Sequence, residues 1–149
     1  MKKALIIYAS FHHGNTEKVA KLIGDTLGAS MVKAEEIKDH TLLEGYDLIG
    51  FGSGIYKGKH HARINQVIEE SDLKGRTVFI FSTSGTGSVK YNKPLIKKLT
   101  EKGVAAVSDF SCKGYDTFGF FKWIGGIAKG HPNNQDLENA RDFAKSFLQ

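Results

Sequence analysis

The strongest constraint on the fold is a regular alternation between short apolar runs and amphipathic segments. Residues 4–9 form an unbroken apolar run of strand length. Apolar residues then recur at helical spacing: Val19, Leu22, Ile23 and Leu27. Strands that are apolar on both faces and separated by helices are typical of a parallel sheet covered on both sides. The alternation therefore predicts an α/β fold with a doubly wound sheet.

We expect five parallel strands and four helices along the 149 residues. The strands are predicted at 3–9, 30–33, 47–52, 77–82 and 104–110. The helices are predicted at 16–27, 62–71, 93–102 and 136–148. Five such strands favour the order 2-1-3-4-5, in which a ligand lies beyond the carboxyl ends of strands 1 and 3. No repeat or linker divides the chain, so we expect residues 1–149 to form a single domain.

Composition excludes several classes of function. The formal net charge is +5, but the lysines are scattered, and neither zinc-ligand spacing nor an RNA-binding aromatic motif is present. We therefore expect no nucleic-acid partner and no metal. No apolar run is long enough to span a membrane, so no membrane insertion is expected. Cys112 is the only cysteine, which excludes an internal disulfide and favours a cytoplasmic location.

The segment after the first apolar run has the composition of a phosphate-binding turn. It consists of Ser10, Phe11, His12, His13, Gly14, Asn15 and Thr16. A turn of this kind that enters a helix exposes backbone N–H groups, and these attract an anion together with the helix dipole. The alternative is a helix cap in an ordinary turn between a strand and a helix.

The segment after the third strand is suited to holding a planar heterocycle. It contains Ser53, Gly54, Ile55, Tyr56, Lys57 and Gly58. The glycines, Gly52 included, let a ring approach the main chain, and the tyrosine offers a flat face. The spacing fits neither a dinucleotide fingerprint nor a Walker A loop.

The segment after the fourth strand is rich in hydroxyl groups and glycine. It contains Ser82, Thr83, Ser84, Gly85, Thr86 and Gly87, and Tyr91 follows closely. These groups can bind the polar edge of a ring, although a flexible polar turn is the simpler interpretation.

Other conspicuous residues are ambiguous. The pairs His12-His13 and His60-His61 follow neighbouring strands and are interpreted as contacts to a ligand, metal ligands or solvated loop residues. Cys112 is interpreted as a structural thiol, because no activating neighbour is evident. The glycine- and aromatic-rich stretch 113–134 predicts either a lid over the core or an apolar rim that docks a partner.

The three polar segments together resemble those of flavodoxins, and the resemblance covers the whole chain. It implies a flavodoxin-like fold and non-covalently bound FMN, with the phosphate at residues 10–16. The flavin ring would lie between the second and third segments, stacked on Tyr56. The resemblance also implies a backbone carbonyl that turns over on reduction, with Gly54 and Gly58 as candidates. The basic charge departs from the acidic character typical of flavodoxins. Positive charge around the second segment favours the anionic, fully reduced flavin and so predicts a less negative potential for the last reduction step. The residues that supply this charge are Lys57, Lys59, His60 and His61.

The resemblance implies an FMN-binding electron-transfer protein that shuttles electrons between redox proteins. The charge of +5 favours partners with acidic docking surfaces, and we expect a monomer or weak dimer. Residues 54–61 also resemble the corresponding loop of flavodoxin-type protoporphyrinogen oxidases, so an FMN-dependent quinone or protoporphyrinogen-type oxidoreductase is the alternative. A cofactor-free flavodoxin-like binding module is a third hypothesis. No catalytic acid–base pair or nucleophile stands out, and the long insertion of those oxidases is absent, which favours the electron carrier.

Overall fold

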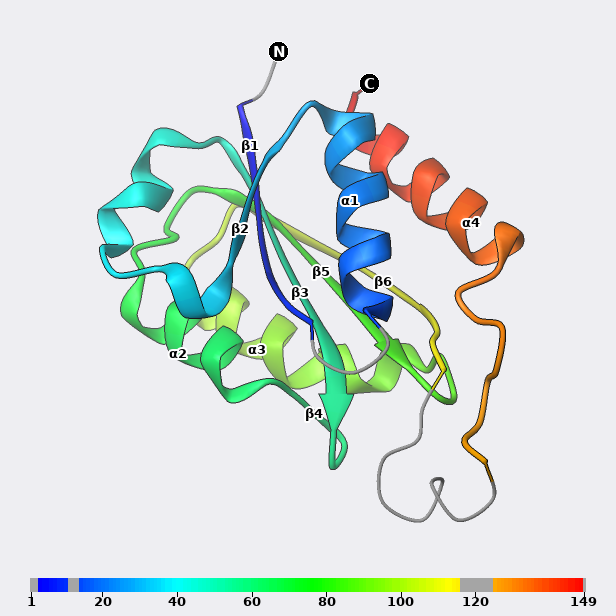
Figure 1. Cartoon of the computed structure of the whole chain (residues 1–149). Coiled ribbons are helices and arrows are strands. Elements are labelled where there is room, and N and C mark those ends of the chain that lie inside the picture. Colours follow the sequence, from blue (N-terminus) through cyan, green and yellow to red (C-terminus); the bar gives the residue numbers. More distant parts are fainter. Residues whose placement is uncertain (1–2, 11–13, 116–124, 149) are drawn as a thin grey trace.

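A parallel sheet forms the centre of the molecule (Figure 1). The computed structural model describes residues 3–10, 14–115 and 125–148. The parallel strands are β1 (Ala4–Ala9), β2 (Ser30–Lys33), β3 (Leu48–Tyr56), β5 (Thr77–Ser84) and β6 (Ala106–Lys113). Their order across the sheet is β2-β1-β3-β5-β6. Counted along the chain as parallel strands only, this is the predicted order 2-1-3-4-5, which is confirmed.

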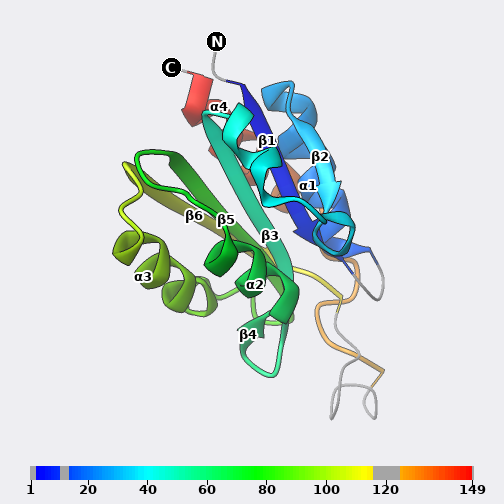
Figure 2. The same ribbon diagram turned by 90° about the vertical axis from the view of Figure 1, so that its left-hand side faces the viewer.

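Helices cover both faces of the sheet, as the alternation predicts. α1 (Asn15–Leu27) and α4 (Asn134–Lys145) pack on one face, and α2 (Ala62–Glu70) and α3 (Lys93–Glu101) pack on the other (Figures 1 and 2). No helix among the described residues is long and apolar enough to cross a membrane.

The last helix is displaced from its predicted range. α4 begins at Asn134, two residues before the predicted start, because Asn133 and Asp136 form a reciprocal capping box. It ends at Lys145, and the 3-10 turn η5 (Ser146–Leu148) follows.

The core lies in two layers because successive strand residues face opposite sides of the sheet. Ile7 and Phe51 pack with the buried side chains of α2 and α3. Ile6 and Phe81 pack with those of α1 and α4. Each large apolar side chain buried in this way stabilises the fold by roughly 1.5–3 kcal/mol.

Two glycines of β3 make room for aromatic rings of the neighbouring strand. Gly50 pairs with Phe79 and Gly52 pairs with Phe81, and a Cβ atom at either glycine would overlap the opposite ring. The interpretation of Gly52 as a residue that admits a ligand ring is therefore wrong: the ring that it admits belongs to Phe81.

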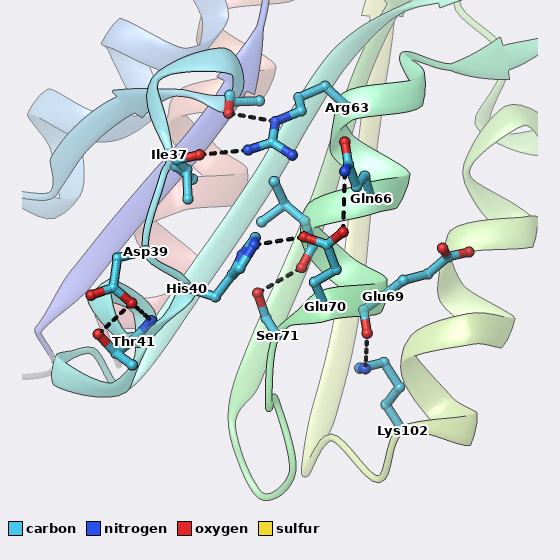
Figure 3. A network of polar contacts seen from close by, with 12 residues as sticks. Ile37, Asp39, His40, Thr41, Arg63, Gln66, Glu69, Glu70, Ser71 and Lys102 are labelled. Carbon is cyan, nitrogen blue, oxygen red and sulfur yellow. Dashed lines mark hydrogen bonds and ion pairs between the residues drawn. The ribbon is translucent and has the colours of Figure 1, made fainter.

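The connection from β2 to β3 contains two 3-10 turns, η1 (Ala34–Glu36) and η2 (His40–Gly45), where no element was predicted. Polar contacts fasten it to α2 (Figure 3). The Arg63 guanidinium donates to the carbonyl oxygens of Ala34, at 3.1 Å, and Ile37, at 2.5 Å. His40 Nε2 lies 2.6 Å from Glu70 Oε2. The contacts of Arg63 and Glu70 hold both 3-10 turns against α2.

Candidate functional site

The three predicted ligand segments meet at one edge of the sheet (Figure 1). β1, β3 and β5 are neighbours and parallel, so the chain leaves all three at the same edge. Thr16, in the first turn of α1, shares a hydrogen bond with Thr83 of β5, with 2.9 Å between the hydroxyl oxygens. This contact joins the first segment directly to the third.

The first segment ends at the N-terminus of α1. Gly14 precedes the helix with a left-handed backbone conformation (φ +65°), and Ser10 Oγ accepts a hydrogen bond from the Glu17 N–H at 3.1 Å. The N–H groups of Asn15 and Thr16 lie in the first turn, where the helix itself offers no carbonyl partner. These donors and the helix dipole can hold a phosphate. Three further predicted residues lie outside the part of the chain that the structure describes: Phe11, His12 and His13.

The second segment is a β-hairpin. The prediction that the strand ends at Gly52 and continues as an open loop is wrong, because β3 runs on to Tyr56 and pairs antiparallel with β4 (Lys59–His60). Lys57 and Gly58 form the turn, with φ angles of +52° and +79°. Two successive residues with positive φ are the geometry that fits a tight hairpin turn. The sequence has Gly only at the second of these positions, which is why the turn is hard to recognise from the sequence.

The residues of the hairpin differ in what they offer a ligand. Ser53 is fully buried, and its Oγ accepts the His61 N–H at 2.9 Å, so its hydroxyl serves the hairpin itself. Gly54 lies within the sheet, paired with Thr83. The Tyr56 side chain folds back over Gly54, so that a Cβ at Gly54 would lie 3.2 Å from the Tyr56 hydroxyl. The Tyr56 ring also contacts the His61 ring edge-on, with 5.7 Å between the ring centres. The ring needed for stacking is present, but it already contacts its own hairpin.

The third segment is part strand and part tight turn. β5 extends two residues beyond the predicted end, to Ser84, because its pairing with β6 continues to Lys113. Ser82 is buried against Ser111, with 2.5 Å between the two hydroxyl oxygens. Ser84 Oγ accepts the Gly87 N–H at 2.9 Å, which closes a turn with Gly85 and Thr86 at its tip. Ser82 and Thr83 are therefore buried within the sheet, whereas Thr86 at the tip of the turn is exposed.

A fourth segment, which begins the stretch 113–134 and was not among the residues predicted to bind FMN, joins the same edge. Gly114 and Tyr115 follow β6, and Asn15 Nδ2 donates to the Tyr115 carbonyl oxygen at 2.9 Å. A Cβ at Gly114 would lie 2.7 Å from that nitrogen, so glycine permits the close approach. The rule that ligands lie beyond the carboxyl ends of parallel strands could have pointed to these residues.

Only part of the stretch 113–134 is described. Tyr115, near the start of the stretch, makes two hydrogen bonds to its later part. The Tyr115 hydroxyl donates to the Gly125 carbonyl at 2.9 Å, and the Tyr115 N–H donates to the His131 carbonyl at 3.0 Å. Residues 125–133 contain no helix. The aromatic residues on which the lid and rim interpretations rest lie outside the described residues: Phe118, Phe120, Phe121 and Trp123.

The charges near the hairpin come from lysines. Lys57 and Lys59 are exposed on either side of Gly58, and Tyr91 lies against that glycine, 3.9 Å from where its Cβ would be. Lys90 Nζ is 5.2 Å from the centre of the Tyr91 ring. An open groove of about 590 Å³ runs between the hairpin and α2, and the residues that line it include Tyr56, Lys57, Lys59, His60, His61 and Glu69.

His60 does not add to this charge. It is buried, and burial lowers its pKa to about 4, although the hydrogen bond to Asn92 favours the charged form. The sequence-based expectation of a positive His60 near the ligand is therefore wrong. His60 is buried because β4 packs against η3 (Val89–Asn92), the turn before α3, which contains Asn92. No local sequence pattern around His60 indicates this burial.

Cys112 is a structural thiol, as predicted. It is buried beside α4, and burial, with a smaller contribution from the Asp136 carboxylate, raises its pKa to about 12. A thiol in this state is a poor nucleophile at neutral pH.

The chain matches known proteins along almost its whole length. The family described as Flavodoxin domain matches residues 5–122. An uncharacterized protein of Methanocaldococcus jannaschii is 47% identical over 149 residues, which is 99% of each chain.

Solved flavodoxin structures share the fold. Oxidised Flavodoxin 2 from Bacillus cereus aligns with a TM-score of 0.73 and 24% identity, over 98% of this chain and 97% of that chain. A flavodoxin from the domain Archaea aligns with a TM-score of 0.69 and 17% identity, over 99% of both chains.

Proposed function

Since the chain belongs to the flavodoxin domain family, we propose that it binds FMN without a covalent bond and carries electrons between redox proteins. The observation that carries this proposal is the convergence of the polar segments at one edge of the sheet. Thr16 is hydrogen-bonded to Thr83, and Asn15 to Tyr115, so these bonds join segments from three places in the chain. The hairpin extends from β3 at the same edge of the sheet.

The chemistry of the donors at α1 fits the phosphate end of FMN. Ser10, Asn15 and Thr16 supply hydroxyl, amide and backbone N–H groups at the positive end of a 13-residue helix. A Cβ at Gly14 would have no atom of the described residues within 4 Å, apart from those of its chain neighbours and its own helix. These residues would hold the phosphate.

The hairpin and the third segment fit the ring end. The turn at Lys57 and Gly58 and the turn at Gly85 and Thr86 present backbone groups, which suit the polar edge of a flavin. Tyr56 is our candidate for the stacking ring. Of the two glycines considered for the mobile carbonyl, Gly58 fits better, because Gly54 is held in the sheet by its pairing with Thr83.

When bound, FMN supplies the electron-transfer chemistry, and the residues of this chain bind it, orient it and set its electrostatic surroundings. Lys57 and Lys59 favour the anionic, fully reduced cofactor. The same two lysines border the groove beside α2. We propose this region as the docking surface for redox proteins with acidic surfaces, which the charge of +5 would also attract over longer distances.

The test of the cofactor compares FMN with riboflavin, which lacks the phosphate. The protein should bind FMN at least about a hundredfold more tightly, because a phosphate held by several charge-assisted hydrogen bonds contributes roughly 3 kcal/mol or more. Binding of neither flavin, measured by fluorescence quenching and calorimetry, would leave the cofactor-free binding module. Equal affinity for both would show that α1 does not hold the phosphate.

The two ends of α1 offer a matched pair of variants. Gly14 and Gly28 flank the helix with φ angles of +65° and +64°, and in the described part of the chain no residue beyond their immediate neighbours comes within 4 Å of either potential Cβ. Gly14→Ala and Gly28→Ala therefore introduce similar backbone strain. We expect only Gly14→Ala to weaken FMN binding, and to leave riboflavin binding nearly unchanged.

A spectrophotometric redox titration separates the carrier from the oxidoreductase. Two resolved one-electron steps support an electron carrier, whereas a single two-electron step with rapid reoxidation by a quinone supports the oxidoreductase.

A further inference from the structure

His60 is an unusual residue for a two-residue strand at the edge of a site. Its neighbour Lys59 is exposed, yet the His60 side chain is buried, with only 4% of the residue accessible. The ring enters the protein beside Asn92 of η3 (Val89–Asn92), and 2.7 Å separates His60 Nε2 from Asn92 Oδ1.

The hydrogen-bond partners of Asn92 determine which ring nitrogen of His60 carries the proton. Asn92 is fully buried, and its Nδ2 faces three acceptors on β6: Asp109 Oδ2 at 3.2 Å, Ser111 Oγ at 3.0 Å and the Phe110 carbonyl at 3.3 Å. Its Oδ1 must therefore face His60, and Nε2 of His60 is the donor. The Nδ1 atom of His60 is buried and has no hydrogen-bond partner among the described residues.

The contacts form a chain from the hairpin into the sheet. His60 binds Asn92, Asn92 binds Ser111 of β6, and the Ser111 hydroxyl binds Ser82 of β5. The hairpin has only two residue pairs of its own, Ile55 with His60 and Tyr56 with Lys59. Two pairs alone give a marginal hairpin in water, so its position depends on contacts with the rest of the protein.

An apolar side chain at position 60 would avoid the desolvation cost of the buried Nδ1, which has no hydrogen-bond partner among the described residues. A hydrogen bond, however, has a direction that apolar contact lacks. The bond to Asn92 fixes both the rotation of the ring and the position of the strand that bears it. The turn at Lys57 and Gly58 is attached directly to that strand.

We propose that His60 and Asn92 are positioning residues that hold the turn at Lys57 and Gly58 in place against the bound flavin and so set its reduction potentials. This inference rests on the proposed function. It assigns the placement of the turn to a hydrogen bond between two buried side chains, His60 and Asn92.

The test uses His60→Phe, which keeps an aromatic ring without the donor, and His60→Gln, whose amide can donate at nearly the position of Nε2. Hydrogen exchange of the hairpin, residues 56–61, is followed in the protein without flavin. We expect exchange to become at least about tenfold faster in His60→Phe, corresponding to about 1.4 kcal/mol, and to remain slow in His60→Gln. Asn92→Leu should match His60→Phe, and the double variant should add little to either.

The control is His40→Phe, which removes a half-buried histidine that also makes a polar contact, here with Glu70 at the C-terminal end of α2, whereas the hairpin precedes the N-terminal end of that helix. It should lower overall stability without changing exchange in residues 56–61. Should His60→Phe accelerate exchange no more than His40→Phe does, the inference is overturned. The same holds if His60→Gln behaves like His60→Phe.

The flavin-loaded protein supplies the second measurement. His60→Phe and Asn92→Leu should shift the separation between the two one-electron potentials and leave the ratio of FMN to riboflavin affinity unchanged. If the wild type binds FMN but the two variants have the same potentials as the wild type, this inference alone is overturned. A wild type that binds no flavin overturns the proposed function, and this inference with it.

Discussion

Thr16 and Thr83 share a buried hydrogen bond, although 67 residues separate them in the chain. The bond links the first turn of α1 to the end of β5, the two elements proposed to hold opposite ends of FMN. It therefore fixes the distance between the first turn of α1 and the end of β5.

Thr16→Val and Thr83→Val should each destabilise the protein by about 1–2 kcal/mol, because each leaves the remaining buried hydroxyl without its partner. Each should also weaken FMN binding. Urea unfolding and FMN titration provide the two measurements. The double variant should cost clearly less than the sum, and strictly additive effects would show that the two hydroxyls are not coupled. Thr100→Val, at an exposed position on α3, is the control.

The glycines of β3 should be intolerant of alanine. Gly50→Ala and Gly52→Ala would force a methyl group into the rings of Phe79 and Phe81, and overpacking of this kind costs about 1–3 kcal/mol or more. The control is Gly45→Ala, whose Cβ would meet, of the residues that the structure describes, only Lys3, with Nζ at 4.0 Å. Thermal unfolding should show a marked loss for the first two variants and almost none for the third. If Gly50→Ala and Gly52→Ala lose as little stability as Gly45→Ala does, the two phenylalanine rings can move aside.

The turn glycine of the hairpin should affect the cofactor rather than the fold alone. Gly58 and Gly75 have φ angles of +79° and +76°, and both are exposed. Alanine at either position should cost about 1 kcal/mol of stability. Only Gly58→Ala should shift the one-electron potentials of bound FMN, as measured by redox titration. A comparable shift in Gly75→Ala would remove the special role of this turn.

His60 should make the protein less stable in acid. Its pKa in the folded protein is about 4, below its ordinary value of 6.5, so between these values the unfolded chain binds more protons than the folded one. The free energy of unfolding therefore rises with pH across this range. The contribution of neutral His60 is present above pH 6.5 and is lost as the pH falls to 4. The depressed pKa of His60 contributes about 3 kcal/mol to the free energy of unfolding, because each pKa unit corresponds to about 1.36 kcal/mol.

Urea unfolding at about pH 7 and about pH 4, in the wild type and His60→Gln, measures this loss. The variant lacks the titrating ring, so it should lose less stability than the wild type over the same range. Identical pH dependence in the two proteins would contradict the neutral state of His60.

Cys112 should be protected from modification in the folded protein. Burial and the Asp136 carboxylate raise its pKa to about 12, so little thiolate forms at neutral pH and the sulfur is covered. Iodoacetamide should label it only after unfolding in urea, with mass spectrometry as the readout. Labelling of the native protein at the rate of a free thiol would show that the region around β6 and α4 opens readily.

The sequence was most informative where a structural signal is local. Residues 4–9 are apolar throughout because both faces of β1 are buried, so their pattern identified the strand directly. The helical spacing of Val19 and Ile23 identified α1 because only one side of that helix packs on the sheet. Strand ends were less certain: β3 continues to Tyr56 because β4 and β5 pair with it, and pairing partners are not encoded in the strand itself.

The sequence by itself determined the α/β class, the strand order and the three segments that follow β1, β3 and β5, because hydrophobic period and turn composition are properties of neighbouring residues. Only the tertiary structure decided how those segments are used. It showed that Gly52 admits Phe81, that Ser53 serves its own hairpin, and that His60 turns inward to Asn92. The physical reason is that burial and hydrogen-bond partners depend on residues far away in the chain, which meet only when the sheet has formed.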